Sequence, residues 1–225
     1  MKDQGAKPKS NSQRAIGQLR QMIFSGDLSA GSDHLESELA DRLGMSRTPV
    51  REAALTLESQ GLLELRPRKG VRILPVSPED MSEIYDVLTE LESLAAEQAA
   101  GMAYDDADLM VLATAIEDMD DALSRDDLQA WADADDRFHA ELVRLGGNSR
   151  VASIVGMMAD QVRRARATTL FMRPLPTQSN EDHRSVLEAI RTGQQDTARL
   201  RHRAHRQQAK QIIIDLLKKH RLSRL

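Results

Sequence analysis

The chain has 225 residues, of which 40% are hydrophobic and 29% charged, so it has room for two modest globular domains. It has no cysteine, which excludes disulfides and thiolate metal ligands and favours a cytoplasmic location. No stretch approaches the roughly 18 consecutive apolar residues of a membrane helix, so no membrane partner is expected. The net charge of −4 is uneven, because residues 1–75 hold 12 basic against 9 acidic side chains, which suits a phosphate-bearing partner.

Polar residues dominate positions 1–12, which are expected to form a disordered arm ahead of a domain over residues 13–75. Apolar residues recur at helical spacing from Ala15 to Ile23, and Gly26 marks the end of this helix. A second, short helix is expected from Glu36 to Leu43.

A third helix is expected to start near Arg47, with the Ser46 side chain capping it and Pro49 in its first turn. Its apolar residues must face a core: Val50, Ala53, Ala54 and Leu57. This turns Arg47, Thr48 and Arg51 outward at the N-terminal end, as in a helix-turn-helix that reads DNA. Amphipathic helices with exposed arginines also occur in other proteins, so this pattern alone leaves both interpretations open.

The segment after Gly61 predicts a β-hairpin, because apolar and charged residues alternate in two short stretches, 63–66 and 71–73. The turn between them is Pro67-Arg68-Lys69-Gly70. A hairpin with a basic tip beside a recognition helix makes a winged helix, and such a tip contacts the DNA backbone or the minor groove.

The stretches LADRLGMSRTPVREA and GLLELRPRKGVRI resemble the winged-helix domain of the GntR superfamily of bacterial transcription regulators, over roughly residues 16–75. The resemblance implies DNA contacts by the following residues: Ser46, Arg47, Thr48, Arg51, Arg68, Lys69 and Gly70. Ser37 stands where this family often has an arginine, so a phosphate contact is expected to be weaker there.

The second domain is expected over residues 76–225, after a boundary marked by two prolines and the capping residue Ser77. Helical periods separated by breaks predict six helices, at about 79–101, 105–124, 126–146, 149–172, 178–192 and 194–221. The predicted fold class is therefore mainly α, a winged helix-turn-helix with a small β-hairpin wing followed by an all-α helical bundle.

Four polar residues fall in apolar helical stripes of this bundle: Asp135, His139, His183 and His205. A buried carboxylate costs several kcal/mol unless it is paired or binds a cation. One divalent transition metal would satisfy all four side chains, whereas each alone is also compatible with a hydrogen-bonded core group. His202 is expected to support the site, and a basic stripe is expected to be solvated: Arg199, Arg203, Arg206 and Lys210.

The stretches ADADDRFHAELVRLGGNSRV and EDHRSVLEAIRTGQQDTARLRHRAH resemble the all-α effector domain of the FadR branch of GntR regulators, called FCD. In metal-binding members of that family an aspartate and three histidines hold a divalent metal, which Asp135, His139, His183 and His205 match. Zinc, nickel and manganese are the candidate metals.

Leu88 departs from the FCD pattern, since an arginine thought to help hold an acidic ligand commonly stands four residues before the glutamate that matches Glu92. We therefore expect an effector pocket for a small oxygen-donor organic acid that depends on the metal more than on any arginine. Its less polar end is expected near Leu88.

Together, the patterns and resemblances predict a homodimeric transcription regulator, a repressor, that binds a palindromic double-stranded DNA operator and responds to a small organic acid. No catalytic residue is assigned. Two other classes stay open: a metal-dependent enzyme that activates water, and a DNA-binding protein whose metal is purely structural.

Overall fold

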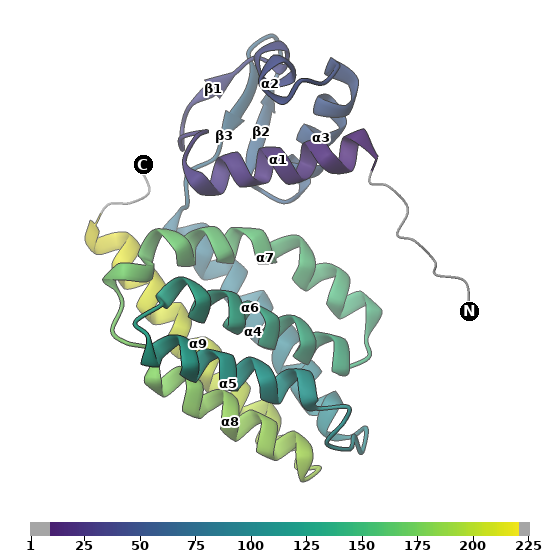
Figure 1. The fold of residues 1–225 in the computed structure, drawn as a ribbon, viewed down its shortest axis with the longest axis vertical. Coiled ribbons are helices and arrows are strands. Elements are labelled where there is room, and N and C mark those ends of the chain that lie inside the picture. The colour runs from purple at the N-terminus through teal and green to yellow at the C-terminus, as the bar shows by residue number, and fades with distance from the viewer. Residues whose placement is uncertain (1–9, 221–225) are drawn as a thin grey trace. The chain divides into compact units, whose positions relative to one another are not determined.

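The computed structural model describes residues 10–220, so most of the expected disordered arm over residues 1–12 lies outside the described residues. Residues 11 and 12 already belong to the first helix, which begins earlier than expected. The chain divides into two compact units between Pro75 and Val76 (Figure 1).

Three helices build the N-terminal unit: α1 (Asn11–Ser25), α2 (Glu36–Leu43) and α3 (Arg47–Ser59). A capping box between Ser10 and Gln13 starts α1, and Gly26 ends it with a φ of 83°, the left-handed conformation that glycine adopts readily. The apolar stripes of the three helices meet in one core, which includes Leu19, Leu39, Val50 and Leu57. The predicted helix-turn-helix is confirmed.

A small antiparallel sheet in the order β1-β3-β2 completes this unit: β1 (Asp33–His34), β2 (Leu63–Arg66) and β3 (Gly70–Ile73). β2 and β3 form the expected hairpin, with Leu63 opposite Ile73. Strand β1 was not predicted, because two residues are too few to show an alternating pattern. Gly70 allows β1 and β3 to pair closely, since a Cβ at Gly70 would lie 2.2 Å from the carbonyl oxygen of His34.

Six α-helices build the described part of the C-terminal unit: α4 (Pro78–Ala100), α5 (Met110–Ser124), α6 (Leu128–Leu145), α7 (Ser149–Thr169), α8 (Thr177–Arg191) and α9 (Gln195–His220). A short 3-10 helix, η1 (Leu170–Met172), follows α7. Helix α4 packs against α6, α7, α8 and α9, so side chains from the whole bundle meet around it. The mainly α fold class is confirmed.

Local sequence signals set two of the helix starts. The Ser77 hydroxyl accepts a hydrogen bond from the Asp80 N–H at 3.1 Å, as its position before α4 predicts. Helix α5 begins at Met110 rather than at residue 105, because Asp105 and Asp108 each accept a hydrogen bond from the other's backbone N–H and hold a turn. None of the described helices has both the length and the apolar character needed to cross a membrane.

Candidate nucleic-acid interface and metal centre

The first turn of α3 presents polar side chains to solvent, as expected for a recognition helix: Ser46, Arg47, Thr48 and Arg51 are exposed. Arg47 and Arg51 keep 72% and 65% of their side-chain surface exposed. Ser46 precedes the helix, but its side chain makes no capping hydrogen bond within the described chain, so the predicted cap is wrong. The backbone N–H groups of this turn therefore remain available to an anion such as a phosphate.

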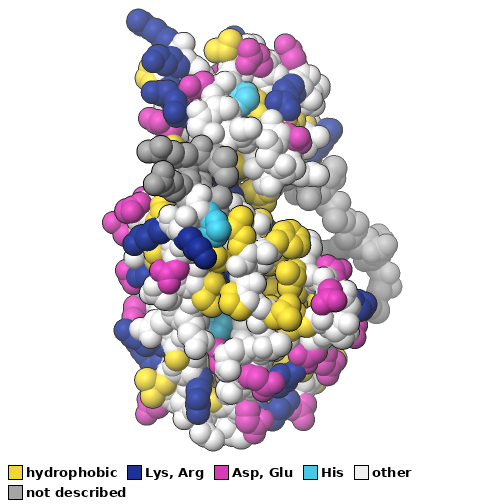
Figure 2. Space-filling view, turned by 90° about the vertical axis from the view of Figure 1, so that its left-hand side faces the viewer, with side chains coloured by type: hydrophobic (Ala, Val, Ile, Leu, Met, Phe, Trp, Pro, Cys, Tyr) yellow, Lys and Arg dark blue, Asp and Glu magenta, His cyan; other side chains and the backbone are white. Residues whose placement is uncertain are grey.

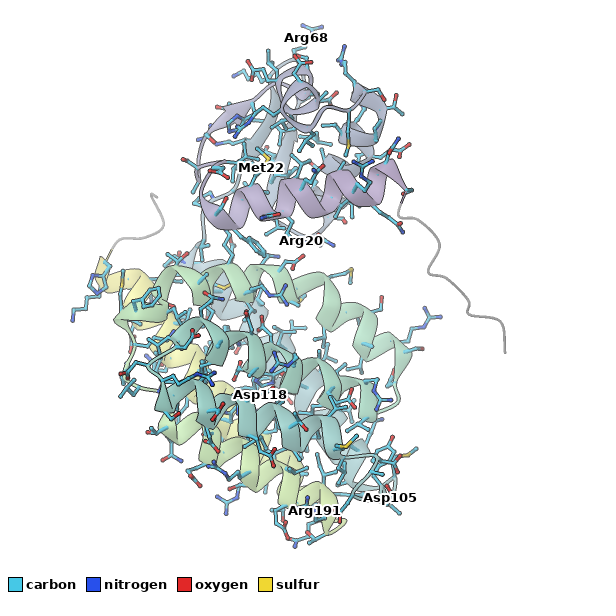
Figure 3. The ribbon with its side chains drawn as sticks, in the orientation of Figure 1. Arg20, Met22, Arg68, Asp105, Asp118 and Arg191 are labelled. Atoms are coloured by element: carbon cyan, nitrogen blue, oxygen red, sulfur yellow. The ribbon has the colours of Figure 1, made fainter. Side chains whose placement is uncertain are left out.

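A groove of about 450 Å³ lies between the start of α3 and the wing. Four arginines line it: Arg47, Arg51, Arg66 and Arg68. Gly70 also lines the groove, Lys69 is exposed beside it, and Arg68 lies at the edge of the unit away from α1 (Figure 3). The sequence interpretation missed Arg66, which lies at the end of β2 and pairs with Asp33 of β1 at 3.2 Å.

The first turn of α2 adds a carboxylate and a hydroxyl to the same groove. Glu36 Oε1 lies 3.5 Å from Arg51 Nη1, and Glu36 Oε2 lies 3.9 Å from Arg47 Nη2. Because both arginines are largely exposed, these pairs contribute little to folding, but they direct the two guanidinium groups into the groove. Ser37 lines the groove without adding a charge, in agreement with its departure from the GntR pattern.

Three helices of the C-terminal unit bring the four candidate metal ligands together. Asp135 and His139 lie one turn apart on α6, His183 lies on α8 and His205 on α9, and their ligand atoms all lie within 4.8 Å of one another. His183 Nε2 is 3.5 Å from Asp135 Oδ1, and His139 Nε2 is 3.8 Å from Asp135 Oδ2. Ligands bound to one ion at about 2.1 Å lie roughly 3–4 Å apart, so this geometry suits a divalent metal.

The protonation states of the buried group also fit a metal. Within the described residues, His139 Nε2 and both ring nitrogens of His183 have no hydrogen-bond partner. Burial lowers the pKa of His139 and of His183 well below the usual histidine value, so both rings are neutral and can donate a lone pair. Burial raises the pKa of Asp135, but Arg166 and the histidines outweigh it and hold that pKa below its usual value. One ionised carboxylate and unpaired neutral imidazoles are suitable ligands for a divalent cation.

Carboxylates lie behind two of the candidate ligands, next to their second ring nitrogens. Glu92 Oε2 of α4 lies 3.0 Å from His139 Nδ1, and Asp182 Oδ2 lies 3.4 Å from His205 Nδ1. Metal-binding histidines commonly present their second ring nitrogen to a carboxylate in this way, which turns Nε2 toward the metal. The sequence pattern did not reveal either carboxylate as part of the site.

Two buried arginines complete the surroundings. Arg166 of α7 donates to Asp135 Oδ2 at 2.7 Å, and Arg206 Nη2 of α9 lies 3.4 Å from Glu92 Oε1. The prediction that Arg206 belongs to a solvated face is wrong, because this residue is 2% exposed and its guanidinium carbon lies 4.7 Å from the centre of the Tyr85 ring. The other residues of that stripe pair with carboxylates of α4: Arg199 with Glu97, Arg203 with Glu90, and Lys210 with Asp86.

Two cavities border the four-ligand group. The first, of about 250 Å³, is lined mainly by α6, α8, α9 and the segment after η1, with Tyr85 of α4 and Arg166 of α7, and it reaches three of the four ligands. The second, of about 270 Å³, is lined mainly by α4, α6 and α7, with Arg206 of α9, and Leu88 lies in its wall. His139, Arg166 and Arg206 line both cavities. A ligand in either cavity can therefore contact two arginines and a candidate metal ligand.

A basic winged helix joined to a helical domain with internal cavities is typical of a DNA-binding transcription regulator. Residues 11–73 match the bacterial regulatory proteins of the gntR family, and residues 83–208 match the FCD domain. The chain belongs to the GntR family of transcription regulators and carries an FCD domain. These families consist of regulators, not enzymes.

Relatives and solved structures agree with this family. The chain is 43% identical over 127 residues to an HTH-type transcriptional regulator from the TAR-I ttuE-ttuC' intergenic region of Agrobacterium vitis, covering 56% of this chain and 74% of the relative. It is 30% identical over 141 residues to the gluconate operon transcriptional repressor of Bacillus licheniformis, covering 63% and 57%. The structure of E. coli McbR/YncC superposes with a TM-score of 0.76 at 22% identity, covering 91% and 97%, and supports the fold.

Proposed function

We propose that this protein is a homodimeric repressor that binds a palindromic operator and leaves it when a small organic acid binds beside a divalent metal in the helical unit. The observation that carries the proposal is the group of Asp135, His139, His183 and His205, bordered by two cavities that buried arginines line. The metal, zinc, nickel or manganese, would supply coordination positions for an oxygen-donor anion.

Seven residues are the proposed DNA contacts: Ser46, Arg47, Thr48 and Arg51 of the recognition helix, and Arg68, Lys69 and Gly70 of the wing. The exposed guanidinium groups can donate two hydrogen bonds each to a guanine edge, and the arginine-lined groove attracts phosphates. One recognition helix covers only a half-site, so a palindrome requires two copies of the chain.

Exposed apolar surface supports association of two copies. Figure 2 shows hydrophobic side chains gathered on one face of the helical unit. Phe171 and Leu175, which follow α7, are 79% and 62% exposed. Apolar surface of this kind is costly on a monomer and is favoured at an interface between subunits.

Arg206 is the arginine best placed to bind an effector carboxylate. Its Nε has no hydrogen-bond partner within the described residues, and it lines both cavities. Arg166 is less available, because Asp135 and Asp136 already engage it. Arg206 would thus supply the charge that the departure at Leu88 removes from α4.

The second cavity favours an effector whose far end is apolar. Besides Leu88, three valines line it: Val143, Val155 and Val162. One relative is named a gluconate operon repressor; gluconate has the proposed hydroxy-carboxylate donor group, although its far end is polar, unlike the effector that these valines favour. We therefore propose a carboxylic or hydroxy-carboxylic acid with its acidic end at the metal and Arg206.

Helix α4 is the proposed route from effector to DNA. Leu88 and Glu92 of α4 line the second cavity, and only residues 74–77 separate the start of α4 from β3 of the winged helix. A change in the position of α4 is therefore passed through a short connection to the element that carries the wing.

Selection of random-sequence DNA with the purified protein, followed by fluorescence anisotropy on the selected sequence, tests the proposal. We expect a palindromic motif, and a loss of affinity on adding carboxylic and hydroxy-carboxylic acids to metal-loaded protein but not to chelator-stripped protein. Failure to select a motif would refute the DNA-binding assignment. Affinity that no acid changes would favour a purely structural metal.

A further inference from the structure

A second group of ligand-capable side chains lies next to the first: Glu92 of α4, His139 of α6 and His202 of α9. All three are buried, and their ligand atoms lie within 4.8 Å of one another. His139 belongs to both groups, because its Nε2 is near Asp135 and its Nδ1 is near Glu92. We infer that the protein has a second divalent-metal position, held by Glu92 Oε2, His139 Nδ1 and His202 Nε2.

The three interatomic distances fit an ion. Glu92 Oε2 lies 3.0 Å from His139 Nδ1 and 3.5 Å from His202 Nε2, and the two nitrogens lie 3.4 Å apart. Neighbouring ligands of an octahedral or tetrahedral ion with bonds of about 2.1 Å are separated by roughly 3–4 Å, as for the first group. The second group therefore accepts an ion with little side-chain movement, and none of its three distances exceeds the 3.5 and 3.8 Å given above for the first group.

Glu92 Oε2 lacks the partners that a buried carboxylate oxygen needs. It lies near two ring nitrogens, yet no aligned hydrogen bond reaches it within the described residues. Glu92 is 3% exposed, so water does not compensate for the missing hydrogen bond. Its other oxygen, Oε1, is directed at Arg206. A cation at Oε2 satisfies this oxygen and takes the place of the hydrogen bond between His139 Nδ1 and His202 Nε2.

His202 is oriented for this role and is not one of the four candidate ligands of the first group. Its ring is fully buried, and its Nδ1 lies 3.4 Å from Ser93 Oγ, which leaves Nε2 facing Glu92 and His139. If Glu92 served only to orient His139, the imidazole of His202 would not be needed beside Glu92 Oε2. The cavity lined by α4, α6 and α7 reaches Glu92 and His139, so an ion has a path from solvent.

His139 is the residue that the two positions share. With an ion at each ring nitrogen, His139 holds no ring proton, and the proton that leaves goes to solvent. The carboxylates Asp135 and Glu92 provide one negative charge to each ion. This inference does not depend on the identity of an effector or on DNA binding.

Metal stoichiometry tests the inference on the full-length protein. Chelator-stripped protein is dialysed to equilibrium against buffered zinc, and a cobalt titration followed by visible absorbance gives an independent count. We expect two ions per chain in the wild type and one in Glu92→Gln and in His202→Ala. His183→Ala, which disrupts only the first group, should also retain one ion. His220→Ala removes an exposed imidazole of the same helix and should retain two.

Several outcomes would overturn the inference. One ion per chain in the wild type that is lost in His183→Ala and kept in Glu92→Gln would leave Glu92 as an orienting carboxylate only. Two ions that persist in both Glu92→Gln and His202→Ala would place the second ion elsewhere. The absence of any ion in His183→Ala, with circular dichroism showing a folded chain, would place all bound metal in the first group. Glu92→Gln changes no side-chain size, so it serves as the main test if His202→Ala fails to fold.

Discussion

Metal binding to the group of Asp135, His139, His183 and His205 should stabilise the helical unit. A ligand that binds only the folded state, at a free concentration 100 times its Kd, adds about 2.7 kcal/mol. In a protein of this size 1 kcal/mol raises Tm by about 2–4 °C. Zinc-loaded protein should therefore unfold roughly 5–11 °C above chelator-stripped protein. The single tryptophan, Trp131, is buried in this unit, so its fluorescence reports the unit's unfolding directly.

Two variants separate this effect from general metal binding. His183→Ala removes a ligand that is fully buried, so zinc should raise its Tm much less than that of the wild type. His220→Ala changes an exposed residue and should keep the full increase. Equal Tm values for stripped and zinc-saturated wild type would refute the metal assignment, as would an increase that His183→Ala retains in full.

Three further predictions concern DNA, protons and the effector. Arg51→Ala should weaken operator binding by about 1–3 kcal/mol in an anisotropy titration. The Tm of the variant should be unchanged, because the Arg51 side chain is exposed. An unchanged affinity for the operator would contradict the proposed role of Arg51. In chelator-stripped protein, folding lowers the pKa of His139 and of His183, so the unfolded chain binds more protons than the folded chain below pH ~6.5. The free energy of unfolding should therefore be highest above that pH and should decrease as pH falls, by up to about 1.4 kcal/mol per pH unit for each ring. Urea unfolding that shows no such decrease between pH 7.5 and 5.5 would contradict this prediction. Leu88→Arg should weaken the binding of an acid with an apolar end, and the binding that remains should depend less on the metal. Calorimetry that shows equal affinity for the acid in metal-loaded and chelator-stripped wild-type protein would refute the dependence on metal.

The sequence predicts best where apolar periodicity is strong. Asp135 and His139 interrupt the apolar stripe of α6, and that interruption is what made them visible as candidate ligands. Apart from α5, which begins five residues later than predicted, the described helices of the bundle begin and end close to their predicted positions, because Gly, Pro and capping residues separate their stripes. The wing was predictable because apolar and charged residues alternate in β2 and β3, whereas β1 is defined only by its pairing with β3.

The remaining site residues depend on tertiary contacts that periodicity does not encode. Arg206 lies in a helix with charged residues on several faces, and only its partners Glu92 and Tyr85 on α4 distinguish it from its exposed neighbours. Arg166 likewise becomes part of the site through Asp135 on another helix. A charged residue that is buried by pairing has the same sequence signature as one that faces water.

The carboxylate at the start of α2 has a consequence for how the protein finds its operator. Glu36 offers Arg47 and Arg51 an anionic partner whenever no DNA is bound. If these arginines make the proposed DNA contacts, each would exchange this carboxylate for a phosphate on random DNA and gain little, whereas at the operator it would gain a specific pair of hydrogen bonds. We therefore expect Glu36 to shorten the time spent on random sequence more than the time spent on the operator. The protein would then have shorter residence times at non-operator sites while it searches a chromosome.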